Sequence, residues 1–303
     1  MMTGRERICR LAELAARTAR AHASTLLYGP ARASVKGLGI EYMDFRDYEY
    51  GDDIKHVDWR LSARMVLPSG EPRLIVKEYE AERSVNALVA VDFSASMGFG
   101  EKVWVATYAA SLVAYTAAKL EDMVTLAILR GGKAEVYWRI DPRSLPGRLK
   151  AALCREGVSG EADLNLLLGT VRKLRPRSPI ILVVDYDHRP GEIDGIARLA
   201  KHNQCTIQAL LVADPYEVSP PIDAALAAFQ DPETGTLVIA HLNEIYSRIR
   251  SHVLSLRARL RASRSGYLEL VGRRQAVAQR ARIVGSYLRA RAGIIAHYQQ
   301  ATF

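Results

Sequence analysis

Two short, continuously apolar runs, each ending in an aspartate, constrain the fold of this chain more than any other feature. They cover residues 86–92 (NALVAVD) and 179–185 (PIILVVD). Strands buried on both faces have this composition, and they occur in parallel sheets that helices cover on both sides. The two runs therefore predict two central parallel strands of an α/β sheet.

The rest of the sheet is predicted by the alternation of further apolar runs with helical stretches. Apolar runs occur at 123–129, 134–140 and 205–212, and helical stretches occur at 101–120, 163–174 and 192–202. This alternation is typical of a doubly wound, mostly parallel sheet. Gly131-Gly132-Lys133 joins the second and third runs as a hairpin, which predicts one antiparallel strand at an edge.

The two ends of the chain predict helices. Ile8, Leu11, Leu14 and Ala15 fall at helical spacing, so an amphipathic helix is expected up to about Leu27. Beyond residue 243, two helices are expected, with a break at Ser265-Gly266. Their apolar faces would be Ile245, Ile249, Val253, Leu256 and Leu260 in the first, and Leu270, Val277, Ala281, Val284 and Leu288 in the second. This divides the chain into a helical and irregular extension (1–84), an α/β domain (85–242) and a helical pair (243–303).

The positive charge is concentrated in the C-terminal part. The chain has a net charge of +9, and residues 247–293 contain twelve arginines and a single acid, Glu269. Such a segment favours an anionic partner. An acidic protein surface is the first expectation, nucleic acid the second and a membrane surface the third. No apolar run reaches the length of a membrane-spanning helix, so no transmembrane segment is predicted.

The cysteines predict no metal knuckle or redox motif. Cys9, Cys154 and Cys205 are far apart and odd in number. Reduced thiols in a cytoplasmic protein are therefore expected.

A candidate metal site follows the first apolar run. Asp92, Ser94 and Ser96 place a carboxylate and two hydroxyls at alternate positions in the loop that leaves a parallel strand. Hard oxygen ligands of this kind suit Mg²⁺ or Mn²⁺. Asp185 ends the other apolar run, and ligands of open α/β sheets bind beyond the carboxyl ends of the strands. The alternative is that Asp92 and its serines only cap a turn.

Two resemblances extend this interpretation. The segment Asp92-Phe93-Ser94-Ala95-Ser96 resembles the first loop of the metal-ion-dependent adhesion site in von Willebrand factor A domains. The upstream segments 39–42, 46–48 and 51–64 resemble the signature of the bacterial family called domain of unknown function 58. Lys77, Glu82-Arg83 and the segment 231–235 also match that family's pattern.

The resemblance implies a sheet of von Willebrand factor A type and a protein-binding function. Members of the family are commonly encoded beside a MoxR-type AAA+ ATPase, and such pairs are thought to remodel or activate client proteins. Asp92, Ser94 and Ser96 would bind Mg²⁺ or Mn²⁺ directly, and Asp185 would act from the third loop of the site, which follows the run 179–185. A carboxylate of the partner would complete the coordination shell of the metal. Ala162 stands where the family has a threonine, so Ser159, Asp163 or water would have to replace that ligand.

The family signature itself allows two interpretations. Arginine–carboxylate pairs and a buried tryptophan could pin this turn-rich stretch onto the sheet, which is the favoured interpretation. The alternative is a surface for a partner. The residues concerned are Asp52, Asp53, Asp58, Trp59, Arg60 and Arg64.

Catalysis is the least supported function. Asp185 and Asp187 resemble the paired aspartates of haloacid-dehalogenase-like phosphatases, but they lie late in the chain and Arg189 departs from that motif. The sequence contains no serine-hydrolase elbow, no zinc-protease motif and no phosphate-binding loop. We therefore expect a non-catalytic, metal-dependent adaptor, with nucleic-acid binding as the alternative and any ATP hydrolysis in the partner.

Overall fold

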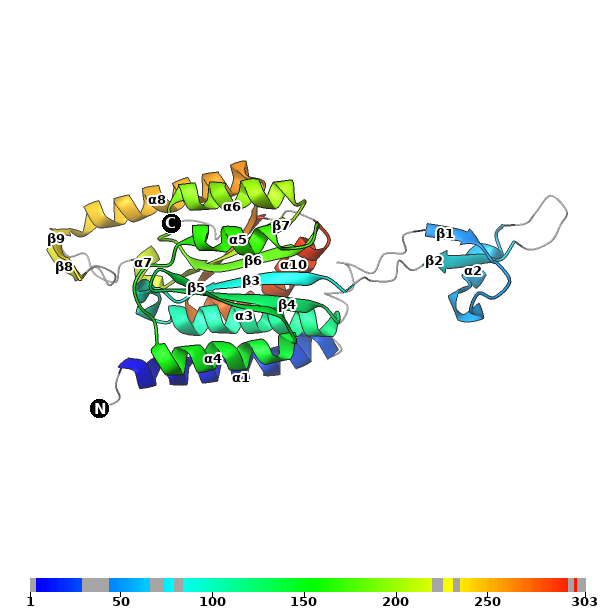
Figure 1. Ribbon diagram of the computed structural model, residues 1–303, viewed down its shortest axis with the longest axis horizontal. Coiled ribbons are helices and arrows are strands. Elements are labelled where there is room, and N and C mark those ends of the chain that lie inside the picture. The colour runs from blue at the N-terminus through cyan, green and yellow to red at the C-terminus, as the bar shows by residue number, and fades with distance from the viewer. Residues whose placement is uncertain are drawn as a thin grey trace. The chain divides into compact units, whose positions relative to one another are not determined.

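The computed structural model describes residues 4–28, 44–65, 73–78, 84–219, 226–230, 235–293 and 297–298 (Figure 1). The chain forms two compact units. One contains residues 1–38 and 85–303, and the other contains residues 39–84. The boundary expected between residues 242 and 243 therefore does not separate compact units. The signature segments 39–42, 82–83 and 231–234 lie outside the described residues.

The larger unit contains a seven-stranded sheet. Its spatial order is β11-β10-β7-β6-β3-β4-β5, and only β5 runs antiparallel to its neighbour. The five predicted strands are confirmed, including the hairpin that makes β5 an edge strand. The strands are β3 (Asn86–Asp92), β4 (Met123–Arg130), β5 (Lys133–Ile140), β6 (Pro179–Asp185), β7 (Thr206–Ala213), β10 (Gly266–Val271) and β11 (His297–Tyr298).

The strand order reverses between β3 and β6. The chain moves outward from β3 to β4 and β5, then returns to the other side of β3 with β6 and continues through β7 to β10. In a doubly wound sheet, the crevice outside this reversal point is the usual ligand site. Asp92 and Asp185 are the last residues of β3 and β6, so both lie at that point.

Helices cover both faces of the sheet, as Figure 1 shows. One apolar core joins the sheet to α1 (Gly4–Tyr28), α3 (Lys102–Lys119), α4 (Leu145–Glu156), α9 (Gly272–Ala278) and α10 (Arg280–Arg291). A second core joins the opposite face to η5 (Leu164–Leu167), α5 (Leu168–Arg172), α6 (Pro190–His202) and α8 (Leu242–Ala262). The layers are those of a doubly wound α/β fold.

The N-terminal helix is confirmed, and three of its four predicted apolar residues, Ile8, Leu11 and Ala15, pack against the core. Ala12, Ala15, Ala19 and Ala23 are buried, whereas Leu14 is 46% exposed. Their small side chains let α1 pack closely on α3, which is itself buried along nearly all of its length. The helix therefore belongs to the core of the larger unit.

The predicted C-terminal helical pair is confirmed in part: α9 and α10 cover most of the expected second helix, but the stretch directly after the break is not helical. Ser265-Gly266 does not join two helices but leads into strand β10, and Leu270 lies in that strand. β10 pairs with β7 in parallel. Its one acid, Glu269, is buried and accepts bonds of 2.5 and 2.8 Å from the Arg257 guanidinium on α8. This ion pair neutralises a carboxylate in the middle of a strand. Because a charged residue interrupts its apolar pattern, the segment was not predicted as a strand.

The expectation of three reduced thiols is also wrong. Cys9 on α1 and Cys154 on α4 form a disulfide, and Cys205 is free. The two helices pack against each other, which brings the thiols together across a sequence separation of 145 residues. Disulfides are typical of oxidising environments. The cysteines therefore no longer favour a cytoplasmic location, which stays a prediction.

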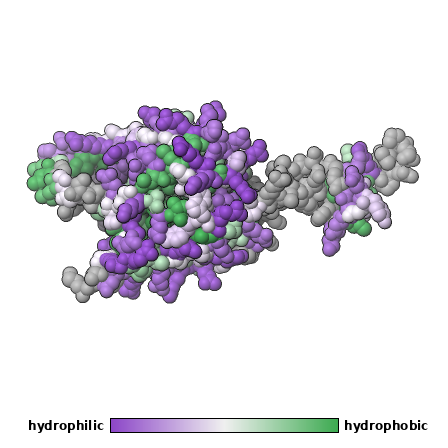
Figure 2. Space-filling view, in the orientation of Figure 1, coloured by the Kyte–Doolittle hydropathy of each residue, from purple (hydrophilic) through white to green (hydrophobic). Residues whose placement is uncertain are grey.

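Two small sheets complete the described structure. In the smaller unit, β1 (Asp44–Asp47) pairs with β2 (Ile75–Glu78) beside η2 (Ile54–His56) and α2 (Trp59–Ser62). In the larger unit, β8 (Leu226–Gln230) and β9 (Leu237–His241) form a hairpin with exposed Leu226, Leu237 and Ile239, visible as a hydrophobic patch in Figure 2. No helix among the described residues is long and apolar enough to cross a membrane.

Candidate functional site

The site lies where the carboxyl ends of three neighbouring strands meet. Asp92 ends β3 and is followed by η3 (Ala95–Gly98), while Asp185 ends β6. Asp214 follows β7 and caps the short helix α7 (Pro215–Val218). Because β3, β6 and β7 are adjacent and parallel, side chains from all three loops reach the same edge.

The four principal residues predicted for a metal site do come together there. The Ser94 and Ser96 hydroxyls lie 3.1 Å apart, and the Ser96 hydroxyl donates to Asp185 Oδ2 at 2.8 Å. Asp92 Oδ1 accepts from the Ser94 backbone N–H at 2.7 Å. All four side chains are buried. The turn-capping alternative for Asp92 is therefore also realised, through the bond to Ser94.

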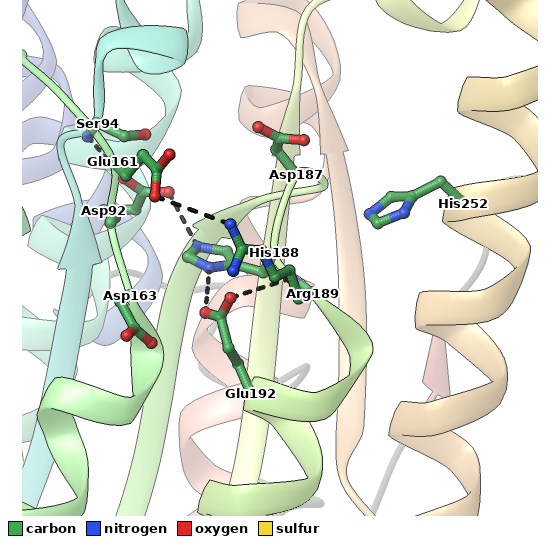
Figure 3. A pocket seen from close by; sticks show the side chains of 10 residues that line it. Asp92, Ser94, Glu161, Asp163, Asp187, His188, Arg189, Glu192 and His252 are labelled. Atoms are coloured by element: carbon green, nitrogen blue, oxygen red, sulfur yellow. Dashed lines mark hydrogen bonds and ion pairs between the residues drawn. The ribbon is translucent and has the colours of Figure 1, made fainter. Parts of the chain in front are cut away.

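A histidine that the sequence did not single out bridges two acids of this site (Figure 3). The buried ring of His188 places Nε2 3.0 Å from Asp92 Oδ2 and Nδ1 3.2 Å from Glu192 Oε2. Ionised carboxylates only accept hydrogen bonds, so both ring nitrogens must donate and the ring is an imidazolium. Burial alone would lower the pKa of His188, but bonds to Asp92 and Glu192 and their charges raise it to about 10.

The same pairing acts on the two acids. Burial opposes ionisation of Asp92, but the His188 charge and hydrogen bonds from His188 and Ser94 hold the pKa of this carboxyl below its usual value. The pKa of Glu192 is likewise lowered, against the effect of burial, by His188 and by backbone N–H groups of Leu164 and Arg189. Both acids are thus charged partners of a buried cation.

A second buried cation neutralises the other strand-end acid. Lys102, in the first turn of α3, places Nζ 2.7 Å from Asp185 Oδ2 and 2.5 Å from Glu217 Oε1 on α7. Its side chain is only 1% exposed. Burial opposes the charge, but the two carboxylates raise the pKa of Lys102 above its ordinary value. Lys102 is therefore a permanent ammonium inside the site.

The loop before η5 (residues 159–163), called the second loop here, was expected to supply further metal ligands, but its side chains have other roles. Asp163 lines the pocket, but its Oδ1 accepts from the Asn165 N–H at 2.7 Å and so caps η5. Ser159 is exposed, and its backbone N–H donates to the Phe93 carbonyl at 3.2 Å. Ala162 lines the pocket with a methyl group where a hydroxyl was expected.

Part of this site, including Asp92, Ser94 and His188, lines a polar pocket of about 280 Å³. Figure 3 shows His188 between Asp92 and Glu192, with Arg189 close by. The side chains of Glu161, Asp187 and Arg189 are exposed. The full lining consists of Asp92, Ser94, Glu161, Ala162, Asp163, Asp187, His188, Arg189, Glu192 and His252.

The residues as arranged do not fit a resident divalent ion. The oxygens of Asp92 accept from Ser94 N–H and His188, and those of Asp185 accept from Tyr186 N–H, the Ser96 hydroxyl and Lys102. An ion at these oxygens would displace donors and lie beside two cations. Within the part of the chain that the structure describes, no group of three or more His, Cys, Asp or Glu side chains is placed to hold a metal.

The family-signature residues lie in the smaller unit and act mainly on the backbone. Asp52, Asp53 and Asp58 accept backbone N–H bonds of 2.9 to 3.0 Å from Glu49, Lys55, Arg60 and Leu61. The three carboxylates therefore have a structural role. Within the smaller unit the Trp59 side chain is 60% exposed, and Arg60 and Arg64 are exposed as well. The packing of Trp59 onto the sheet stays a prediction.

Many of the C-terminal arginines are engaged within the protein. Arg257 pairs with Glu269, Arg259 with Asp194, Arg273 with Glu101 and Arg291 with Asp122. Arg261 lies over the Tyr267 ring and Arg289 is buried. Arg257 and Arg289 are buried and Arg291 is largely so, whereas Arg259 and Arg261 stay exposed, so only part of the expected basic tail is committed inside the protein.

Sequence reasoning missed Lys102, His188, Glu192 and Glu217. One local signal existed, because His188 and Glu192 are four residues apart at the start of a helix, a spacing that brings two side chains together. The other contacts join residues 83 to 115 positions apart. Such pairings have no local signature.

Comparison with known proteins gives one family. The family model described as "Protein of unknown function DUF58" matches residues 44–262. Uncharacterized proteins of Mycobacterium bovis and Mycobacterium tuberculosis are each 26% identical over 224 residues, covering 70% of this chain and 67% of theirs. A solved aerotolerance-related membrane protein of Bacteroides fragilis, with multiple mutations to serine, is similar over 68% of this chain and 98% of its own, at 13% identity and a TM-score of 0.40.

Proposed function

We propose that this chain, which belongs to the DUF58 family, is a non-catalytic protein-binding adaptor. Its binding surface would be the polar edge at the carboxyl ends of β3 and β6. The partner would be a MoxR-type AAA+ ATPase, which supplies any ATP hydrolysis, and the pair would act on client proteins. The choice of partner rests on the family resemblance.

The non-catalytic part of the proposal rests on the hydrogen bonds of Asp92 and Asp185, whose carboxylate oxygens all accept from donors within the protein. A nucleophile or general base needs an oxygen directed at the substrate. Both oxygens of Asp92 and both of Asp185 already accept bonds from protein donors. This arrangement argues against Asp185 as the nucleophile of a phosphatase and favours a site that presents a surface.

The sheet supports a fold of von Willebrand factor A type. Counting from β3, the strands follow the order of a doubly wound sheet, with a single antiparallel strand, β5, at one edge. The segment from Asp92 to Ser96 lies at the reversal point, where the adhesion-site loop of that fold is expected. The exposed side chains at the rim of the pocket (Glu161, Asp187 and Arg189) would meet the partner first.

Nucleic-acid binding is the weaker candidate. It would require the C-terminal arginines to form a surface for phosphates. The internal pairs of Arg257, Arg259, Arg273 and Arg291 remove several of them from that role.

Capture of the ATPase tests the proposal. The purified protein would be immobilised and incubated with the MoxR-type ATPase encoded in the same genome, in the presence of Mg²⁺ and ATP. We expect capture by the wild type and several-fold weaker capture by Arg189→Glu, because a reversed rim charge repels a complementary partner. Arg175→Glu is the matched control, since Arg175 is equally exposed but lies before β6, at the opposite edge. Failure of the wild type to capture the ATPase, or equal loss in both variants, would refute the proposed surface.

A further inference from the structure

The loops of the site are tied together by side chains of the protein itself. His188, in the loop after β6, reaches Asp92 at the end of β3. Glu192 accepts from His188 and also, at 2.9 Å, from the backbone N–H of Leu164 in the second loop. One imidazolium and one carboxylate therefore connect all three loops on which metal ligands were expected.

A second tie extends this network to the next strand. Lys102 joins Asp185 at the end of β6 to Glu217 on α7, which follows β7. The two cations thus offset half of the charge of four carboxylates that are buried or partly buried. An unpaired buried carboxylate is costly. Against the effect of burial, the pairing with His188 lowers the pKa of Asp92 and Glu192, whereas burial raises the pKa of Glu217.

The positions of the two cations conflict with a metal ion. A divalent ion bound to Asp92 would lie close to the His188 ring, and one bound to Asp185 would lie close to the Lys102 ammonium. Like charges at such short distances repel strongly in a buried site. Ala162 independently removes the hydroxyl that the second loop would contribute.

We infer that His188 and Lys102 replace the divalent ion in this chain, so that the site assembles without metal. They act as positioning residues, holding the loops after β3, β6 and β7 against one another. For the proposed function, on which this consequence rests, partner binding needs no metal-bridged carboxylate. The partner instead meets the side chains at the rim of the pocket.

Titration with Mn²⁺ tests the inference on the protein alone, so its outcome is independent of partner capture. Free Mn²⁺ would be followed by electron paramagnetic resonance. The decisive variant combines His188→Ala with Ala162→Thr, which removes the blocking cation and restores the missing hydroxyl. We expect it to bind one Mn²⁺ at least about ten-fold more tightly than the wild type does. Adding Asp92→Asn to this variant should abolish the gain.

Two controls separate charge from shape. Ala162→Thr alone restores the hydroxyl but keeps His188, and should bind no more Mn²⁺ than the wild type. His188→Lys with Ala162→Thr keeps a cation at the same place and should also show no gain. Circular dichroism would establish that each variant is folded, and His188→Gln would replace His188→Ala if the latter does not fold.

The inference is overturned by either of two results. The first is stoichiometric Mn²⁺ binding by the wild type that disappears in Asp92→Asn, which would mean that a metal displaces His188 readily. The second is the absence of any gain both in a folded His188→Ala, Ala162→Thr variant and in the same variant with Lys102→Met added, which would mean that these cations are not what excludes the ion. If neither His188 variant folds, the wild-type titration decides alone.

Discussion

Raising the pH should destabilise this protein through His188. Burial by itself lowers the pKa of this ring, but Asp92 and Glu192 raise it from 6.5 to about 10. The folded state therefore keeps a proton that the unfolded state has already released. Stability from this source is fully present below about pH 6.5 and is lost as the pH rises toward 10.

The magnitude follows from the two pKa values. Between them, the free energy of unfolding falls by about 1.4 kcal/mol per pH unit. From about pH 6.5 to about pH 8.5 the loss is about 2 kcal/mol, because the unfolded ring is only half titrated at the start of this window. The pH range ends below 9.0, the ordinary pKa of a cysteine thiol. Burial raises the pKa of Cys205 above that value, so at higher pH this thiol would also lower the free energy of unfolding.

Urea unfolding followed by far-ultraviolet circular dichroism, at a series of pH values, measures this effect. The wild type should lose stability across the window, and His188→Gln should not, because it carries no titrating group at this position. His252→Gln is the matched control: His252 lines the same pocket but binds the Tyr186 carbonyl at 2.8 Å, and this variant should keep the slope. A wild type whose stability is flat across the window, or an unchanged slope in His188→Gln, would refute an imidazolium at this site.

Three further predictions concern other parts of the molecule. Arg257→Met should lower the free energy of unfolding in urea by about 3–5 kcal/mol, because it leaves Glu269 buried without its cation. Adding Glu269→Leu should recover most of this loss, and a double variant no more stable than the single one would contradict the explanation. Removing the Cys9–Cys154 disulfide with a cysteine-to-alanine pair should cost about 2–5 kcal/mol, and peptide mapping without reductant should recover the linked peptides, whose absence would disprove the bond. Trp59→Ala should change stability by less than about 0.5 kcal/mol because Trp59 is largely exposed, and a larger loss would show that it packs.

The central sheet could be predicted because its signal is local. A continuously apolar run such as 86–92 or 179–185 has few alternatives to a buried strand, and the position of Asp92 and Asp185 at one edge follows from parallel pairing. Strand β10 could not be found in this way, since Glu269 interrupts its apolar pattern and only the guanidinium of Arg257 makes that burial acceptable.

The candidate site was predicted in position but not in chemistry. The spacing of Asp92, Ser94 and Ser96 showed which oxygens would converge. It did not show what would neutralise them, because His188 and Lys102 are 96 and 83 residues away from the acids they meet. The identity of a buried counter-charge depends on tertiary packing, and a motif read along the chain contains no information about it.

The insertion of residues 39–84 between α1 and β3 has a consequence for how the protein is made. Helix α1 leaves the ribosome before the helices it packs against, since α3 and α4 end at residues 119 and 156, and the sheet gains β10 only at residue 271. The smaller unit needs only its own residues and can form early. The alanine-rich face of α1 therefore stays uncovered while the smaller unit, α3 and α4 are being translated.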